Sequence, residues 1–373
     1  MTSPAWRTVV FYVSGHGFGH AVRQIEIINA LEASADIEII VRTAAPSWLF
    51  ERSLRRPASL EPFVPDTGVF QVDSLRLDAD RTIDDAAAFY GELASRAERE
   101  AAWLIRERAA LVLADAPPLA CAAAARAGVP CVVVGNFTWD WIYQRYDTPL
   151  QRHPWLLPTI EQAYALATEA WRLPMWGGFD SIARVTDVPF VARRSRRPST
   201  EVRAAFGWPV TQPVALLSFG GYGLSAASRS PVDAGEFVLV TVSSGHGDVD
   251  LDVRGGQMIS IAEASIYDRG FRYEDLVAAA DVVVTKPGYG IISECIANST
   301  AILYTSRGDF IEYDRLTREM PRYLAAEYID HDDLFGGRWA PSLDRLRRRS
   351  APTPAPRTDG ATVIAGLVRA RVA

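Results

Sequence analysis

Lysine is almost absent from this chain of 373 residues. Lys286 is the single lysine among 39 basic residues, and all the others are arginines. The lysine ammonium is a compact charge, whereas the arginine guanidinium is a wide planar fork, so the two are not interchangeable in a tight site. The one position that keeps lysine is therefore a candidate functional residue. Its chance survival is the alternative.

Cysteines are also scarce, and long apolar runs are missing. The three cysteines have no metal-site spacing, which favours a reduced, cytoplasmic protein over a disulfide scaffold. No apolar run approaches the roughly 20 residues of a membrane span, and no cleavable signal is visible at the amino terminus. A net charge of -6 argues against nucleic-acid binding. We expect no integral membrane segment and no nucleic-acid partner.

With 49% apolar residues, the chain is long enough for two domains with separate cores. Apolar runs alternate with helical patterns in both halves, which predicts βαβ units and parallel sheets. We expect an α/β protein with two Rossmann-like, doubly wound domains facing across a cleft. The predicted segments are 1–192, 193–349 and a Pro-rich tail with a terminal helix at 350–373. One long helix is expected over 87–108.

A glycine-rich loop follows the predicted strand 8–13 and reads Ser-Gly-His-Gly-Phe-Gly-His. It matches neither the dinucleotide fingerprint nor a Walker loop. His16 and His20 have a spacing that can bind metal on a helix, but the glycines between them oppose a helix there. His20 stands where a helix begins, and the positive end of the helix dipole favours a neutral imidazole, the form a base requires. Asp115 ends a neighbouring strand and is the candidate to orient His20. A histidine that only caps the helix is the alternative.

The segment FYVSGHGFGHAVR resembles the amino-terminal glycosyltransferase-like domain of plant arabinokinases and its stand-alone bacterial relatives. The resemblance continues through ADAPPLACAAAARAGVP, VGNFTWDWIY, DVPFVARR, LLSFGG and TKPGYGIISE, over about residues 8–340. More distantly, the loop is similar to that of the peptidoglycan glucosaminyltransferase and the plant UDP-glycosyltransferases. These families imply the glycosyltransferase B (GT-B) fold. They also imply that His20 is the general base and Asp115 its orienting aspartate.

Lys286 begins a second glycine-rich turn, which precedes a helix over 290–297. Such a turn suits a diphosphate, because free N–H groups and the helix dipole point towards it. The helical pattern leaves one small, polar face that we expect to be open, and Glu294 on that face is a candidate partner for ribose hydroxyls. The resemblance implies a nucleotide-sugar site here. A solvated helix residue is the alternative for Glu294. The full set of donor-binding candidates is Gly17, Gly19, Ser218, Gly220, Gly221, Lys286, Gly288, Tyr289, Gly290, Ser293, Glu294, Asp309 and Glu312.

The resemblance places donor-sugar contacts in the loop after strand 301–304, which makes Asp309 and Glu312 the candidates there. Their spacing departs from the pair in the plant enzymes, so the identity of the sugar stays open. Phe271 and Tyr273 are candidates to border the base, with ordinary packing as the alternative. Aromatic side chains can form sugar-binding surfaces, although tryptophan is more often core. The acceptor-binding candidates are His16, Phe18, Asn136, Trp139 and Asp140.

These observations predict an inverting glycosyltransferase that needs neither metal nor cofactor. It would move a sugar from a nucleotide-diphosphate donor to a small-molecule or glycan acceptor, with UDP favoured by the resemblance. No Asp-x-Asp metal motif stands in a suitable loop, and the helix terminus and Lys286 would stabilise the departing diphosphate. A nucleotide-sugar epimerase on the same fold and a non-catalytic nucleotide-sugar-binding module are the alternatives.

Overall fold

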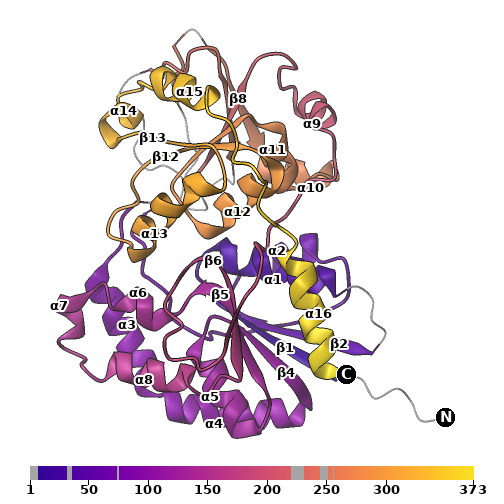
Figure 1. Ribbon diagram of the computed structural model, residues 1–373, viewed down its shortest axis with the longest axis vertical. Helices are drawn as coiled ribbons and strands as arrows, with labels where there is room; N and C mark the ends of the chain where they lie inside the picture. Colours follow the sequence, from indigo (N-terminus) through magenta and orange to yellow (C-terminus); the bar gives the residue numbers. More distant parts are fainter. Residues whose placement is uncertain (1–6, 32–35, 74, 220–230, 244–250, 255) are drawn as a thin grey trace. The chain divides into compact units, whose positions relative to one another are not determined.

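The computed structural model describes residues 7–31, 36–73, 75–219, 231–243, 251–254 and 256–373, which form two compact units (Figure 1). Unit 1 comprises Met1–Phe70, Asp78–Val191 and Arg357–Ala373. Unit 2 comprises Gln71–Leu77 and Ala192–Pro356. Each unit is built on a parallel sheet with helical crossovers, which confirms the predicted α/β class. None of the helices in the described residues combines the length and apolar character needed to cross a bilayer.

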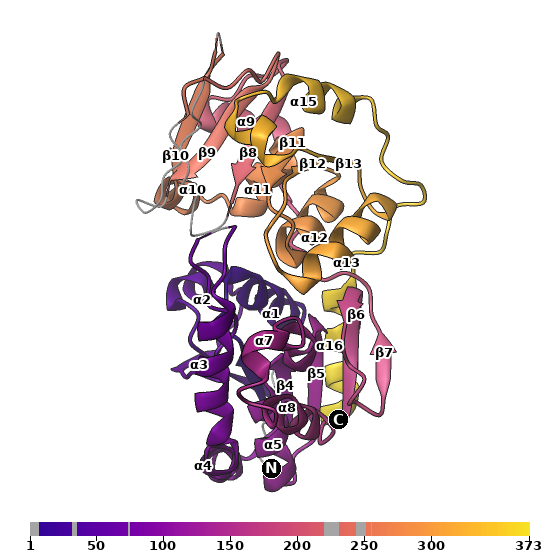
Figure 2. The ribbon, with the colours of Figure 1, turned by 90° about the vertical axis from the view of Figure 1, so that its left-hand side faces the viewer.

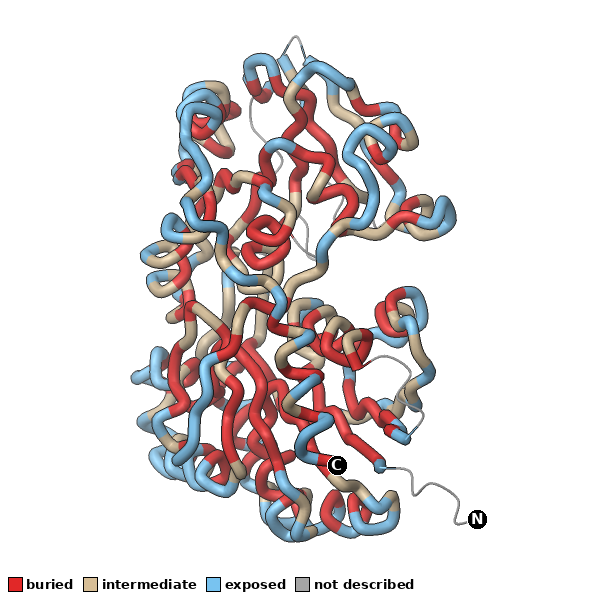
Figure 3. Tube along the Cα trace, turned by 45° about the vertical axis from the view of Figure 1, so that its right-hand side comes forward, coloured by how far each residue is buried: buried red, intermediate tan, exposed pale blue. Residues whose placement is uncertain are grey.

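The sheet of unit 1 has seven strands among the described residues, in the order β3-β2-β1-β4-β5-β6-β7, all parallel. Its central strands are continuous apolar runs, as expected for a parallel sheet covered on both faces (Figure 3). The strands are β1 (Arg7–Val13), β2 (Ile37–Thr43), β3 (Ser59–Pro62), β4 (Ala109–Asp115), β5 (Cys131–Phe137), β6 (Glu169–Gly177) and β7 (Val185–Asp187).

The helices of unit 1 surround this sheet. Helix α5 shows how the sequence sets its ends, because Pro118 begins it and Gly128 follows it with a φ of 69°, a value that suits glycine. The helices are α1 (Phe18–Ala30), α2 (Ser47–Ser53), α3 (Ala79–Gly91), α4 (Leu93–Arg106), α5 (Pro118–Ala127), α6 (Trp139–Tyr143), α7 (Asp147–Leu150), α8 (Leu156–Tyr164) and α16 (Gly360–Val372). The single helix expected over 87–108 is instead two, α3 and α4, which divide at Glu92 directly after Gly91, a weak helix former.

Unit 2 carries a second parallel sheet, in the order β10-β9-β8-β11-β12-β13 (Figure 2). Its strands are β8 (Val214–Ser218), β9 (Val238–Ser243), β10 (Met258–Ala262), β11 (Val282–Thr285), β12 (Ala301–Tyr304) and β13 (Ala326–Tyr328). Its helical segments are α9 (Ser199–Phe206), α10 (Glu263–Asp268), α11 (Tyr273–Ala279), α12 (Tyr289–Asn298), α13 (Ile311–Glu319), η1 (Met320–Arg322), α14 (His331–Phe335) and α15 (Ala340–Arg347).

The terminal segment differs from the separate tail that the sequence suggested. Helix α16 packs beside α1 in unit 1, as Figure 1 shows in yellow and indigo. Ile364 and Val368 on α16 are fully buried in the core of unit 1. The Arg369 guanidinium donates to the carbonyls of Ala30 and Leu31, at 3.0 and 2.9 Å, and so covers the end of α1. Unit 1 is therefore assembled from segments on both sides of unit 2 in the sequence.

We expect Ile364→Ala to lower the free energy of unfolding of unit 1 by about 2–5 kcal/mol, because it removes buried methyl groups and leaves a cavity. Urea unfolding followed by intrinsic fluorescence measures the change. The matched control is Thr362→Ala at an exposed position of the same helix. Equal stability of the two variants would show that α16 contributes little to the core.

Candidate active site

The glycine-rich loop of unit 1 joins β1 to α1 and brings His20 into the first turn of the helix. Gly17 precedes α1 with a φ of 73°, a backbone conformation that favours glycine. No side chain caps the helix start. Gly19 is open, since a Cβ there would meet no atom within 4 Å. The His20 side chain lies at the positive end of the α1 dipole and is 6% exposed.

Asp115 is the last residue of β4, and the sheet register pairs it with Val13 at the end of β1. This places the carboxylate beside the loop, and Asp115 Oδ1 lies 2.8 Å from His20 Nδ1. The structure thus brings together the two residues that the sequence assigned as base and orienting aspartate. An ionised carboxylate can only accept a hydrogen bond, so Nδ1–H donates and the lone pair stays on Nε2.

Arg23 and Gln24, one turn after His20 on α1, complete the surroundings of Asp115, and sequence reasoning missed both. Arg23 donates to both carboxylate oxygens, at 2.8 and 2.6 Å, and Gln24 Nε2 donates to Oδ2 at 2.7 Å. Burial alone raises the pKa of Asp115, but the charges of Arg23 and His20 and their hydrogen bonds outweigh it and hold the pKa well below its usual range. The spacing of three and four residues from His20 was the available signal.

Asn136, next to the last residue of β5, is connected to Asp115 through Arg23. Its Oδ1 accepts from the Arg23 guanidinium, and its Nδ2 donates to the Pro174 carbonyl at 2.7 Å. Asn136 is 5% exposed. These contacts suit the positioning of Arg23, which in turn donates to Asp115.

A second buried carboxylate, Asp66, lies near His20, and sequence reasoning missed it as well. Asp66 accepts from Ser14 Oγ and from Trp139 Nε1, both at 2.9 Å. Burial raises the pKa of Asp66 to about 6, although the charge of His20 and both hydrogen bonds favour its ionised form. Asp66 belongs to an irregular segment between β3 and α3, where no periodicity marks a residue. Only its Pro-Asp-Thr-Gly turn signal was visible in the sequence.

The predicted acceptor residues divide into buried and exposed groups. The Trp139 ring is 1% exposed, with ring centroids 6.3 Å from His20 and 5.9 Å from His16, and stacks on Tyr143 at 5.6 Å. It is therefore an inner wall and not an exposed platform. Phe18 is 39% exposed and meets Trp48 edge to face. Asp140 is buried, which raises its pKa, and its Oδ1 has no hydrogen-bond partner among the described residues.

In unit 2, the turn 286–288 leads into α12 at the carboxyl edge of β11. Gly288 precedes the helix without a side-chain cap, and a Cβ at Gly288 would meet no atom within 4 Å. Gly288, Tyr289 and Gly290 are all partly exposed. The first N–H groups of α12 have no partner within the helix and can meet an anion from this side.

The expected open face of α12 is instead covered. Ser293 and Glu294 are 8% and 4% exposed, and Ser293 Oγ donates to the Gly290 carbonyl. Arg193 Nε donates to Glu294 Oε1 at 2.7 Å, and its NH1 lies 3.4 Å from Glu274 Oε2. Sequence reasoning missed Arg193 because the segment around it resembles a linker. The largely buried Arg193 is held by two carboxylates, which raise its pKa against the effect of burial.

The remaining donor candidates lie along the same edge of the sheet. Tyr273 OH donates to Ser218 Oγ at 2.6 Å, so these two candidates meet at the end of β8. Phe271 packs against Phe206, the ordinary role that the sequence left open. Gly220 and Gly221 lie outside the described residues. Asp309 is exposed in the loop after β12, while Glu312 is 7% exposed at the start of α13.

Lys286 directly follows β11, beside α12, and is largely buried. Burial and the nearby charge of Arg307 lower the pKa of Lys286 to about 7, against the opposing influence of Glu312 and Asp73.

Within the described residues, no group of three or more His, Cys, Asp or Glu side chains could hold a metal ion.

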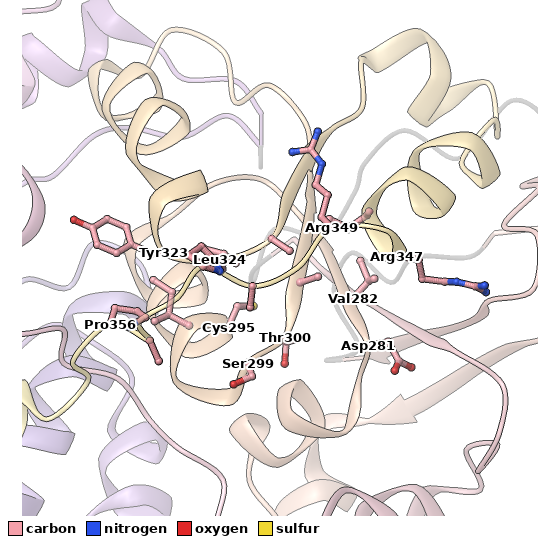
Figure 4. A pocket seen from close by; sticks show the side chains of 17 residues that line it. Asp281, Val282, Cys295, Ser299, Thr300, Tyr323, Leu324, Arg347, Arg349 and Pro356 are labelled. Atoms are coloured by element: carbon pink, nitrogen blue, oxygen red, sulfur yellow. The ribbon is translucent and has the colours of Figure 1, made fainter.

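A pocket of about 250 Å³ opens in unit 2 at the amino-terminal edge of its sheet, opposite the edge that carries Lys286 (Figure 4). Asp281 and Ala301, which border it, stand at the amino ends of β11 and β12. Pro352 and Pro356 from the segment after α15 also line it. Ligands of doubly wound sheets bind at the carboxyl ends of the strands, so this pocket is not the predicted donor site.

Comparison with known proteins gives one sequence relative and many structural neighbours. No family model matches the chain. The chain is 30% identical over 344 residues to L-arabinokinase of Arabidopsis thaliana. That match covers 90% of this chain but only 32% of the relative, so the chain spans about a third of the relative's length.

Solved glycosyltransferases share the fold over nearly the whole chain. The calicheamicin glycosyltransferase CalG4 is 14% identical, with a TM-score of 0.62 and coverage of 98% of both chains. The glycosyltransferase of kitacinnamycin is 17% identical, with a TM-score of 0.57 over 99% of this chain and 100% of its own. Phytolacca americana UGT2, solved with UDP-2-fluoro-glucose and pterostilbene, is 12% identical, with a TM-score of 0.55 over 98% and 99%. The chain therefore has the GT-B fold.

We expect Asp66→Asn to change how stability depends on pH. The folded pKa of about 6 lies above the ordinary 3.8, so Asp66 adds stability when protonated, and that contribution is lost as pH rises through 6. Between pH 4.5 and pH 7 the wild type loses about 2 kcal/mol that the variant keeps. Urea unfolding at both pH values measures this, with exposed Asp180→Asn as the control. A constant difference between wild type and variant would contradict the raised pKa.

Proposed function

We propose that the chain is an inverting glycosyltransferase that transfers a sugar from a nucleotide diphosphate, with UDP favoured, to an acceptor hydroxyl without a metal ion. The observation that carries this proposal is the buried network in which Asp115 fixes the His20 imidazole. The GT-B fold and the 30% identity to L-arabinokinase support it. The kinase activity in that relative's name is not carried over, because the match covers 32% of it.

His20 supplies the base in this proposal. Its Nδ1–H is held by Asp115, so Nε2 accepts the proton of the acceptor hydroxyl as the oxygen attacks the anomeric carbon. The new carbon–oxygen bond forms as the bond to the diphosphate breaks, and the electron pair leaves on the diphosphate oxygen. Attack opposite to the leaving group inverts the anomeric centre. The ionised Asp115 stabilises the resulting imidazolium.

The donor is assigned to unit 2. The uncapped start of α12 and the Lys286 ammonium together offer N–H donors and positive charge to a diphosphate. Glu294 is not assigned a donor contact, because it is 4% exposed and its carboxylate is held by Arg193. Ser218 and Tyr273 border the nucleoside in this assignment.

We expect His20→Ala to lower turnover by about 100- to 10,000-fold, because it removes the proposed base. Donor binding should persist, because the donor is assigned to unit 2 and His20 lies in unit 1. Calorimetry with UDP-glucose measures binding, and mass spectrometry of products from an extract supplemented with the donor measures transfer. The control is His153→Ala, a histidine that pairs with Asp84 on the surface of unit 1. Unchanged turnover in His20→Ala would refute the base assignment.

The same assay discriminates the alternatives. A product formed from the donor alone, without any acceptor, would indicate a nucleotide-sugar epimerase. Donor binding without turnover in the wild type would indicate a binding module.

We expect the affinity for UDP-glucose to fall by up to about thirtyfold between pH 6 and pH 8.5. The Lys286 ammonium carries its charge below its pKa of about 7 and loses it above, while the diphosphate diester does not titrate in this range. Calorimetry across this range measures the slope. Lys286→Met should bind weakly with little slope, and Lys286→Arg should keep its charge at every pH. An affinity of the wild type that does not vary with pH would remove Lys286 from the site.

A further inference from the structure

Three polar residues, Lys286, Thr305 and Arg307, stand where β11 and β12 end, and Thr305 and Arg307 have not yet been given a role. Lys286 follows β11 and Thr305 follows β12, and the strands are paired through Thr285 and Tyr304. The Thr305 N–H donates to the Thr285 carbonyl at 3.1 Å, which keeps the two chains adjacent past the strand ends. Arg307 stands two residues further along the same loop.

The Arg307 guanidinium is largely but not fully buried, and it is loosely bonded. It lies over the Phe310 ring at 4.0 Å, and its side chain is 11% exposed. NH1 lies 3.4 Å from the Pro287 carbonyl oxygen and 3.7 Å from Glu312 Oε1, both beyond a good charged hydrogen bond. Its Nε has no hydrogen-bond partner among the described residues. The stacking therefore fixes the fork without satisfying its donors.

Thr305 and Lys286 also have side-chain polar atoms without a hydrogen-bond partner among the described residues. Thr305 Oγ1 is buried and has no hydrogen-bond partner in the described part of the chain. Across the same residues, no hydrogen bond or ion pair to Lys286 Nζ is found, although Arg307 lies close enough for its charge to lower the pKa of Lys286. Buried polar groups in folded proteins are nearly always paired, so two unpaired buried atoms at one sheet edge, Thr305 Oγ1 and Arg307 Nε, are unusual.

The charges around this edge favour an anion. Two cations, Lys286 and Arg307, face one buried carboxylate, Glu312. The other nearby carboxylate, Asp73, is already engaged, because Oδ2 accepts from Arg76 Nε and Oδ1 from the Leu75 and Arg76 N–H groups. With Asp73 engaged, Lys286 and Arg307 face only the carboxylate of Glu312. The balance is an excess of positive charge beside the uncapped start of α12.

We propose that Arg307, Thr305 and Lys286 form an oxyanion-binding site at the carboxyl edge of β11 and β12. Its ligand is a phosphate of the donor diphosphate or a carboxylate on the transferred sugar; both offer oxygens to a planar fork, an ammonium and a hydroxyl. The assignment to a donor sugar rests on the proposed function, whereas the oxyanion site itself does not. Arg307 extends the site beyond the glycine-rich turn. It would bind the departing diphosphate or the sugar carboxylate without a metal ion.

Calorimetry with inorganic pyrophosphate, UDP, UDP-glucose and UDP-glucuronate tests this proposal on the wild type and on Arg307→Gln. We expect Arg307→Gln to weaken an oxyanion ligand by about 10- to 100-fold, the effect of losing charged hydrogen bonds. The matched control is Arg347→Gln, which removes the same charge from the opposite edge of unit 2. Thr305→Val provides a second, nearly isosteric variant should Arg307→Gln fail to fold, and we expect it to weaken the same ligands.

The four ligands separate the sources of the anion. A loss shared by pyrophosphate, UDP and UDP-glucose assigns Arg307 to the diphosphate, and a loss confined to UDP-glucuronate assigns it to a sugar carboxylate. Loss of pyrophosphate binding in a protein that binds no nucleotide sugar would support the oxyanion site and count against the proposed function. Wild-type affinities for all four ligands in both variants, or no binding of any ligand to the wild type, would overturn the proposal.

Discussion

The buried carboxylate of Asp115 is the point on which the arrangement in unit 1 depends. It accepts from His20, Arg23 and Gln24, three residues within two turns of α1, and so fixes the helix against the end of β4. A buried charge is stable only when it is paired and hydrogen-bonded, and here Arg23 supplies the opposite charge. The same contacts that stabilise the charged carboxylate in the core also set the orientation of the imidazole. Structure and proposed chemistry therefore rest on one residue.

Much of this could be predicted from the sequence because its signals are local. The alternation of apolar runs and helical patterns indicated parallel sheets in both halves, and β12 has the predicted bounds. A residue after a parallel strand must lie at the carboxyl edge of the sheet, which is why His20 and Asp115 could be paired across 95 positions. Such inferences need only the order of the strands and no knowledge of side-chain packing.

Contacts between segments without periodicity could not be predicted. Asp66 lies in an irregular segment, yet it joins Ser14 to Trp139 beside His20. Arg193 belongs to a stretch rich in arginine, serine and proline, yet it occupies the carboxylate that the helical pattern of α12 presented as open. Both contacts depend on where an irregular chain runs in three dimensions. The pattern of a helix shows which residues share a face, but not what covers it.

The return of α16 to unit 1 has a consequence for the order in which the protein is made. A ribosome releases the segments of unit 1 up to Val191 first, then the main segment of unit 2, Ala192–Pro356, and only after it α16. Ile364 and Val368 pack into a core whose members outside α16 all lie at or before Val191 in the sequence. Until the main segment of unit 2 has been made, α16 is not yet available to cover the face of α1 against which it later packs. The segments of unit 2, in contrast, are all made before α16.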